Sequence, residues 1–501
     1  MAWLSLLVTS ILCLILAILI STKLSNDSRK LPPGPKGWPV IGNMLEVRTA
    51  PYSALANLSQ IHGPVMWVKL GSIDTMVISS SEAAAEMFSN QHDLSFAGRT
   101  TKVALRVRDF HQASLIVSQY GPYWRLLRGI YNTKLMTDAQ INHSKNVRAK
   151  CMDMVIRWIT KEADEKGSVG IARFVSLLSM NMIGNVALSK ESIVDPNTKE
   201  GSEFFTTFKQ GIELIAATNF ADLFPILQKL DPQSIESNGT ETMGRILNYV
   251  LGFVNERVSD REKGLLNSPK DILDLMLEHQ GTDKDTEIPM ENFGILITEL
   301  LVGSTDSSTT TIEWALAELL KSPNLMKTLQ EELDNVVGPG NKVEEDHIEK
   351  LKFLQAVIKE TLRLHAPVPL LLPRRAMEDT QFRGYVIPKD TQILVNVWAI
   401  GRDPVNWEDP LVFKPERFLS SSRDYRGQNF EFLPFGGGQR MCAGVKLADR
   451  ILHLSLGTFI HSFEWALESG TTPENIDMSE RMGFTLQKRE SLKVVLKPRK
   501  L

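Results

Sequence analysis

Apolar residues recur at helical spacing through most of this chain. Between Thr137 and Gln280 they form amphipathic patterns with acidic and basic residues on the outer faces, and such patterns predict helices. Near the start, the alternating run at residues 65–71 is followed by an apolar run at residues 74–79, with Gly71 at the junction. These two runs predict a β-hairpin. Near the end of the chain, Leu486–Leu496 predicts a closing pair of strands.

The longest helical pattern extends from Asn292 to Leu320. At ~1.5 Å per residue it predicts a helix roughly 43 Å long, enough to cross the whole body. Its middle, Gly303–Thr311, is rich in Ser and Thr around Asp306. Such hydroxyls can bond back to the carbonyl four residues earlier and bend or open a helix. A cluster of this kind is usually a packing device, but it also predicts a polar notch suited to O2 and a proton relay.

The first 22 residues contain no charged side chain. As a helix, Trp3–Ile20 would span roughly 27 Å, close to the thickness of a bilayer core. Neither a basic start nor a small-residue cleavage site marks a signal peptide. We therefore predict an uncleaved membrane anchor at residues 1–22. The basic residues Lys23, Arg29 and Lys30 place the following body on the cytosolic side.

Residues 23–45 form a basic linker that contains Leu31-Pro32-Pro33-Gly34-Pro35. Because each proline fixes φ and removes a donor, this run predicts a stiff hinge, and residues 46–501 are expected to form the catalytic body. The chain has 501 residues, 43% hydrophobic and 23% charged, with a net charge of -3, which gives no sign of a nucleic-acid partner. Its three cysteines allow no disulfide framework, as in a reducing compartment.

One cysteine lies in a glycine-rich loop before a helical pattern. Cys442 follows Gly436, Gly437 and Gly438 and precedes an apolar-periodic run that begins near Val445. The amides at a helix start favour a thiolate, and the glycines allow a close approach to a flat ligand. One thiolate is too few ligands for structural zinc, whereas haem iron needs only one axial ligand from the protein. An isolated cysteine is otherwise most often a buried small hydrophobe.

The segment around this cysteine resembles a known motif. Phe435, Gly438, Arg440, Cys442 and Gly444 stand at the defining positions of Phe-x-x-Gly-x-Arg-x-Cys-x-Gly, the haem-binding motif of the cytochrome P450 family. By the same resemblance, Phe435, Gly436 and Arg440 are expected to contact the haem. The resemblance implies one mainly α body with a small β region. It also implies haem b (iron-protoporphyrin IX) with Cys442 as the axial thiolate.

Three further residues are expected to hold the haem propionates. Trp124 and Arg128 share one helix face, and by themselves they could equally be a surface Trp/Arg pair. Their match to the Trp-x-x-x-Arg pattern of the family implies that they bind a propionate. Arg374, which follows the proline-rich stretch 366–373, is expected to reach a propionate for the same reason.

Opposite charges at Glu360 and Arg363 are, on their own, typical of an exposed helix pair. The resemblance joins them to Arg417 in a buried Glu-Arg-Arg network behind the cysteine loop. Loss of one partner would then leave a buried charge unpaired, which costs several kcal/mol.

The hydroxyl-rich helix, followed by Glu313-Trp314-Ala315, resembles the oxygen-activation groove of plant members of the family. Two positions depart from the pattern: Ser304 replaces the usual glycine and Ser307 the usual threonine. We expect Asp306 and Ser307 to deliver protons. For Ser304 two roles stay open, namely narrowing the distal pocket and binding a polar group of the substrate. An apolar substrate pocket is expected from a further set of residues. These are Leu301, Val302, Val368, Leu370 and Phe484.

The resemblance implies a monooxygenase that uses O2 and NADPH electrons. No Gly-x-Gly-x-x-Gly turn follows a strand, so the electrons are expected from NADPH-cytochrome P450 reductase at the endoplasmic reticulum membrane. The run Asp222–Gln233 is similar to that of plant members that oxidise monoterpenoids, iridoids and alkaloids. Such a lipophilic specialised metabolite is the expected substrate. Two alternatives stay open, namely oxidative phenol coupling or rearrangement without oxygen insertion, and haem binding without catalysis.

Overall fold

The computed structural model describes residues 30–265, 270–279 and 287–499. The anchor predicted at residues 1–22 lies outside the described residues, as does most of the basic linker. Within the described residues, α9 alone has the length and apolarity of a membrane span, but 83% of that stretch is buried inside the protein. It is therefore a core helix of the body.

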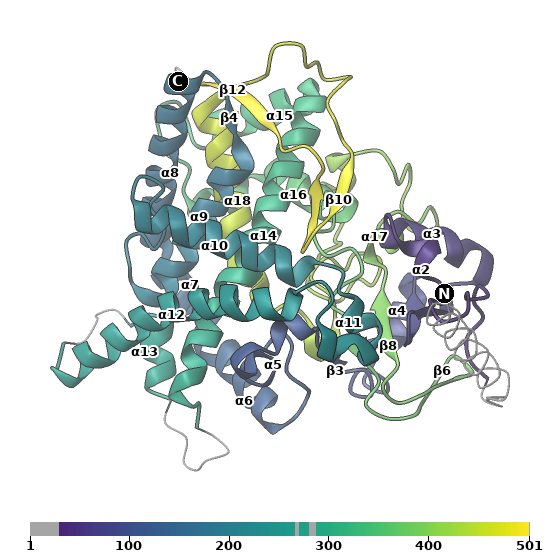
Figure 1. Ribbon diagram of the computed structural model, residues 1–501. Helices are drawn as coiled ribbons and strands as arrows, with labels where there is room; N and C mark the ends of the chain where they lie inside the picture. Colours follow the sequence, from purple (N-terminus) through teal and green to yellow (C-terminus); the bar gives the residue numbers. More distant parts are fainter. Residues whose placement is uncertain (1–29, 266–269, 280–286, 500–501) are drawn as a thin grey trace, which may run out of the picture.

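The helices form the larger part of the molecule, and α14 runs through its middle (Figure 1). It packs against α9, α12, α16 and α18, so that most of its side chains are buried. The α-helices are α2 (Met44–Val47), α3 (Pro51–His62), α4 (Ser81–Met87), α5 (Phe110–Ala113), α6 (Pro122–Ile130), α7 (Asp138–His143), α8 (Lys145–Lys166), α9 (Ile171–Leu188), α10 (Lys199–Ala216), α11 (Phe220–Leu223), α12 (Ile235–Glu262), α13 (Ile272–Leu277), α14 (Met290–Lys321), α15 (Pro323–Val336), α16 (Lys352–Leu364), α17 (Val397–Ile400) and α18 (Val445–Ser462).

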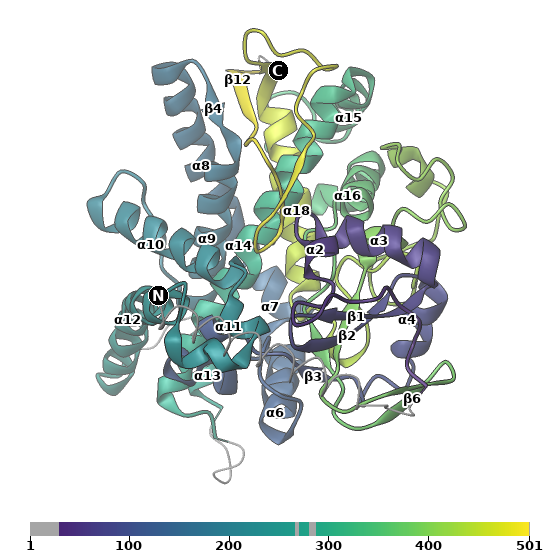
Figure 2. The ribbon, with the colours of Figure 1, turned by 45° about the vertical axis from the view of Figure 1, so that its right-hand side comes forward.

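The smaller part contains a five-stranded sheet in the order β1-β2-β8-β5-β3, beside α2, α3 and α4 (Figure 2). The predicted hairpin is confirmed, because β1 and β2 pair antiparallel and Gly71 in the turn has φ of 64°. The strands are β1 (Val65–Leu70), β2 (Ile73–Ile78), β3 (Gly98–Arg99), β4 (Val169–Gly170), β5 (Arg374–Arg375), β6 (Thr380–Phe382), β7 (Tyr385–Ile387), β8 (Gln392–Val395), β9 (Phe463–Leu467), β10 (Glu480–Met482), β11 (Leu486–Lys488) and β12 (Lys493–Pro498).

The proline-rich hinge is bonded to the sheet. The carbonyl of Pro33 accepts the N–H of Trp67 at 2.8 Å, and the carbonyl of Lys30 accepts the N–H of Val386 at 2.9 Å. The prolines cannot donate, but their carbonyls can still accept, so this segment pairs through its oxygens. This segment is therefore hydrogen-bonded to strands β1 and β7 rather than free.

Two predictions about long elements have different outcomes. The helix expected at Asn292–Leu320 is confirmed as α14, and its hydroxyl-rich centre stays helical throughout. The strand pair expected across residues 486–496 is wrong: β11 pairs with β10, whereas β12 pairs with β4 and β9. The mainly α fold with a small β region is confirmed.

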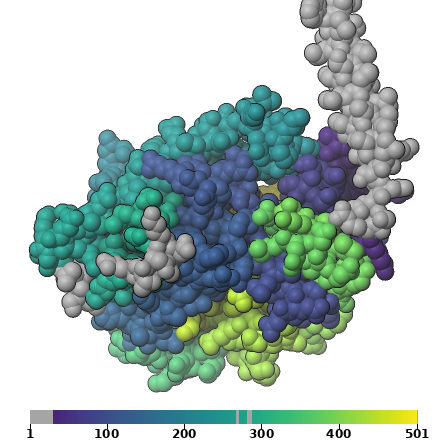
Figure 3. All heavy atoms as spheres, turned by 90° about the horizontal axis from the view of Figure 1, so that it is seen from below, coloured from purple at the N-terminus to yellow at the C-terminus, as the bar shows by residue number. Residues whose placement is uncertain are grey.

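From below, yellow atoms near the C-terminal end of the chain emerge beside blue atoms of the 100–150 region (Figure 3).

Candidate active site

The cysteine loop is shaped by its glycines and by one carboxylate from far away in the sequence. Gly436 and Gly438 have φ of 71° and 63°, values that disfavour other residues. A Cβ at Gly438 would lie 2.2 Å from Oδ1 of Asp93. Asp93 also accepts the N–H of Gln439 at 2.6 Å, and thereby ties the loop to the segment after α4. These glycines therefore make room for a protein carboxylate.

The Cys442 side chain is exposed, yet it is surrounded by protein at the start of α18. Burial raises the pKa of its thiol, while the N–H of Gly444 and the charge of Arg128 act in the opposite direction. The groups predicted to favour a thiolate are thus present, but burial raises the pKa of the thiol by more than these groups lower it. Coordination to a metal ion deprotonates a thiol outright, so this side chain would bind an iron ion as a thiolate.

Buried arginines gather next to the cysteine loop. Arg374 donates to Oδ1 of Asp93 and to the carbonyl of Gly437, each at 2.7 Å. Arg440 donates to the carbonyls of Ala97 and Ser118 at 2.9 and 2.7 Å. Burial and, to a smaller extent, the charges of Arg374 and Arg128 together lower the pKa of Arg440 to about 9. A lowered pKa in arginine indicates a positive charge that its surroundings do not neutralise.

Arg99 is a member of this cluster that sequence reasoning missed. It donates to the carbonyls of Ile116 and Leu372 at 3.0 and 2.8 Å, and burial together with Arg440 and Arg374 lowers its pKa well below the usual value. Among the described residues, only Arg374 of these arginines forms an ion pair. An excess of buried positive charge beside an accessible thiol fits a group with two carboxylates, as haem has. Sequence reasoning had no motif that placed Arg99 here.

Trp124 and Arg128 differ in how well they match the propionate prediction. The indole N–H of Trp124 donates to the carbonyl of Leu115 at 2.9 Å, and Arg440 lies 4.4 Å from the indole ring. In this structure the indole N–H of Trp124 is therefore already engaged, and Trp124 holds a loop and stacks on an arginine; its role toward a propionate stays a prediction. Arg128 is half-buried and close enough to interact electrostatically with Cys442. It remains a candidate ligand for a propionate.

The structure brings Glu360, Arg363 and Arg417 together. The Glu360 carboxylate is fully buried and accepts two bonds from Arg363 at 2.7 Å each and one from Arg417 at 3.1 Å. It also accepts the N–H of Lys414 at 2.9 Å. The spare guanidinium donors reach backbone carbonyls, such as that of Gly401 at 2.6 Å. Each buried charge therefore has partners from several segments.

One stripe of α14 is accessible although the rest of this helix segment is buried. Leu300, Gly303, Ser304 and Ser307 are half-buried or exposed, and they share a face at i, i+3, i+4 and i+7. We call this stripe the open face of α14. A Cβ at Gly303 would lie 3.6 Å from Cδ1 of Ile116, so the loop before α6 covers it. The predicted polar notch is thus formed by side chains, while the helix itself stays intact.

The hydroxyls of this region bond back along the helix as predicted. Ser304 donates to the carbonyl of Leu300 at 2.8 Å, and Ser307 donates to that of Gly303 at 2.9 Å. Thr309 and Thr311 make the same type of bond at 2.7 and 2.8 Å. Each bond satisfies the hydroxyl proton locally, so no gap in the helix is required.

Asp306 does not lie on the open face. Its carboxylate is buried and accepts the hydroxyl of Thr485 at 2.6 Å and the amide of Gln487 at 3.1 Å. Nζ of Lys209, on α10, is 3.7 Å from Oδ1. The role expected for Asp306 in proton delivery stays a prediction, and in this structure the carboxylate would have to act from outside the open face. The carboxylate points toward the β10–β11 hairpin, on a different side of α14 from Ser307.

The expected pocket residues divide into two groups. Val368 and Phe484 are half-buried, as lining residues should be. Leu301 and Leu370 are 1% and 8% exposed and are packed into core clusters, and Val302 is 8% exposed. The structure thus packs these three into the core. For Leu301 and Val302, the apolar pattern of α14 did not reveal which side packs inward.

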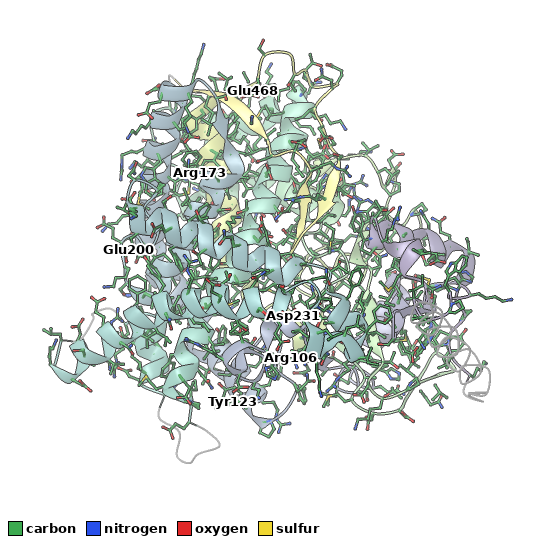
Figure 4. The ribbon with its side chains drawn as sticks, in the orientation of Figure 1. Arg106, Tyr123, Arg173, Glu200, Asp231 and Glu468 are labelled. Atoms are coloured by element: carbon green, nitrogen blue, oxygen red, sulfur yellow. The ribbon has the colours of Figure 1, made fainter. Side chains whose placement is uncertain are left out.

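The loop at residues 96–120, which we call the distal loop, is hydrogen-bonded to residues of α10, α11, α12 and α14. Glu299, a second residue that sequence reasoning missed, accepts the N–H groups of Leu115 and Ile116 at 2.9 and 2.7 Å. Burial raises the pKa of this carboxyl to about 7. The side chain of Arg106, labelled in Figure 4, is exposed and donates to Gln228 at 3.4 Å. Glu299 thus places Ile116 over the open face.

Comparison with known proteins gives a consistent result over nearly the whole chain. The family model described as Cytochrome P450 matches residues 32–494. Iridoid oxidase of Catharanthus roseus is 42% identical over 494 residues, covering 97% of this chain and 95% of that protein. Geraniol 8-hydroxylase of Swertia mussotii is 38% identical over 474 residues, covering 95% of each chain. The matches include the cysteine loop and the open face.

A solved structure has the same fold. A zebrafish protein, described as a cytochrome P450 structure with progesterone, superposes with a TM-score of 0.76 at 25% sequence identity. The superposition covers 89% of this chain and 99% of that chain.

Proposed function

The chain belongs to the cytochrome P450 family and is a haem-thiolate monooxygenase, and from that premise we propose that it hydroxylates or further oxidises a monoterpenoid or iridoid. The observation that supports this most directly is the open face of α14, which combines two hydroxyls with apolar cover from Ile116. The neighbouring residue Leu115 links this cover to the cysteine loop, because its carbonyl accepts a bond from Arg440 at 3.4 Å. The named relatives, an iridoid oxidase and a geraniol 8-hydroxylase, support the substrate class.

Haem, when bound, supplies the iron at which O2 is reduced, and its thiolate ligand favours cleavage of the O–O bond. We assign Cys442 as the axial ligand, and Phe435 and Gly436 to the shape of its loop. Arg374, Arg440 and Arg128 would hold the propionates, with Arg99 as a fourth buried cation. Trp124 packs against Arg440 and keeps its guanidinium in place.

The residues of α14 would control protons and water. Ser307 lies on the open face, where its Oγ can hold a proton beside the reacting oxygen. Asp306 would act from behind the helix, because its carboxylate is bonded to Thr485 and Gln487. A proton that passes from Asp306 to Ser307 therefore needs bridging water or a side-chain rotation.

The remaining surroundings favour an apolar substrate body. Ile116, Val368 and Phe484 are half-buried apolar side chains from three different segments. Such walls bind a terpenoid skeleton through the hydrophobic effect. Electrons would come from NADPH through NADPH-cytochrome P450 reductase, with both proteins at the endoplasmic reticulum membrane and the catalytic body in the cytosol.

Turnover under isotopically labelled O2 tests this proposal. The full-length haem-loaded protein would be reconstituted with the reductase, NADPH and geraniol or an iridoid alcohol under ¹⁸O2. We expect product with one ¹⁸O atom per hydroxylation, formed only when NADPH and reductase are both present. Consumption of the substrate without label in the product would instead support coupling or rearrangement. Absence of substrate-dependent NADPH oxidation with a panel of terpenoids would contradict the proposed substrate class.

A further inference from the structure

The serine that departs from the family pattern occupies the open face beside Ser307. We propose that Ser304 binds a hydrogen-bond-donating group of the substrate, so that the enzyme selects terpenoid alcohols over ethers, aldehydes and hydrocarbons of the same skeleton. This inference rests on the proposed function, because it specifies the substrate of that same pocket. Glycine, the usual residue at this position, could not make this contact.

The position of Ser304 supports a contact with a bound molecule. Its side chain is half-buried, whereas Thr305, the next residue along the helix, is fully buried. Gly303 beside it has no side chain and lies under Ile116. Within the described residues, the only partners of the Ser304 hydroxyl are carbonyls of its own helix, at 2.8 Å from Leu300 and 3.3 Å from Leu301. Its outer side therefore faces accessible space.

The direction of this hydrogen bond determines which group can be recognised. A serine hydroxyl has one proton to donate and two lone pairs that accept. The Ser304 proton is directed to the Leu300 carbonyl, which leaves acceptor capacity toward the open side. Ser307 has the same arrangement through Gly303. The open face thus presents acceptors, which pair with an alcohol O–H and not with an ether or carbonyl oxygen.

The two carboxylates of α14 next to this face, those of Glu299 and Asp306, already have hydrogen-bond partners in the protein. Both oxygens of Glu299 accept backbone N–H groups of the distal loop. Asp306 is bonded to Thr485 and Gln487 on a different side of the helix. The neighbouring lining residue Ile116 is apolar. The acceptors that remain are Ser304 and Ser307, and Ser307 is assigned to proton delivery. An alcohol group in this region would consequently pair with Ser304, while its skeleton contacts the apolar walls.

Ligand titrations of the haem-loaded protein test the proposal without turnover. Dissociation constants would be measured from the substrate-induced shift of the haem spectrum for geraniol, its methyl ether and the corresponding aldehyde. We expect geraniol to bind about threefold to tenfold more tightly than the ether and the aldehyde, as one neutral hydrogen bond predicts. Ser304→Ala should reduce both ratios to about one. Ser304→Thr, which keeps the hydroxyl, should retain them.

Ser308→Ala is the matched control, because Ser308 is a buried serine of the same helix, off the open face. It should leave the ratios unchanged. Equal binding of alcohol and ether by the unmodified protein would overturn the proposal, as would a preference that survives Ser304→Ala. Binding of the aldehyde as tight as that of the alcohol would show that Ser304 donates, and would also overturn it. Failure of the proposed function differs, since it would appear as absent product whatever the binding ratios.

Discussion

The two sides of the candidate haem site are built differently. Behind the cysteine loop, the buried carboxylate of Glu360 is bonded to Arg363, Arg417 and the backbone of Lys414. On the open face of α14, Ser304 and Ser307 stay accessible, and within the described part of the chain their hydroxyls bond only to their own helix. The first arrangement joins distant segments and resists change. The second leaves room for ligands, because its hydroxyls support nothing else.

This difference predicts that substitutions at or behind the cysteine loop abolish haem binding, whereas substitutions on the open face change activity by degrees. The largest effect is expected for Cys442→Ala, which removes the only assigned axial ligand. It should abolish the red-shifted Soret band of the ferrous carbonyl form, measured by difference spectroscopy. Cys151→Ala is the matched control, because Cys151 is buried in the core. A persisting band in Cys442→Ala would refute the ligand assignment.

Glu360→Ala should have the next largest effect. It leaves two buried guanidinium groups without their carboxylate, at a cost of about 3–5 kcal/mol. We expect loss of haem, measured as the ratio of haem absorbance to protein in the purified material. Glu331→Ala removes one partner of an exposed i, i+4 pair on α15 and should change stability by less than about 0.5 kcal/mol. Full haem content in Glu360→Ala would mean that the network does not hold this side.

Glu299→Gln should change the pH dependence of stability. The folded protein raises the pKa of this carboxyl from about 4.5 to about 7, so it retains a proton that the unfolded chain loses between these values. The stabilising contribution is therefore complete below pH 4.5 and lost as pH rises through 7. Glutamine does not titrate, so its stability relative to the natural protein should rise by about 2–3 kcal/mol from pH 4.5 to 8.

Thermal unfolding of both haem-loaded proteins across this pH range provides the measurement. Glu331→Gln, at an exposed position, should show no such trend. A constant difference in unfolding temperature between Glu299→Gln and the natural protein would contradict the raised pKa.

The smallest effect is expected for Ser307→Ala. Loss of one hydroxyl should raise the peroxide released per NADPH consumed by about twofold to tenfold, because proton delivery slows while haem binding is unaffected. Ser308→Ala controls for a general effect on the helix. An unchanged ratio of peroxide to NADPH in Ser307→Ala would remove Ser307 from the proton path.

Local patterns predicted the elements of the fold well. The hairpin at Gly71 and the long helix α14 were correct because both depend on short-range periodicity. The strand pair expected at residues 486–496 was wrong, because strand pairing is decided by contacts with β4 and β9, far away in the sequence. Leu301 and Val302 were misplaced for a similar reason. Helical spacing shows that a face is apolar, but not that Leu300 and Gly303 are the accessible residues beside them.

The sequence by itself determined the family and the residues of the buried charge network, and it predicted the cysteine ligand, because these are specified by residue types at fixed spacing. Only the tertiary structure decided which partner each polar group takes. Asp306 binds Thr485 and Gln487, and Asp93 joins Arg374 to the cysteine loop. Such pairs form between segments tens to hundreds of residues apart. Their choice depends on how whole helices pack, because a buried charge or donor binds whatever complementary group that packing places beside it.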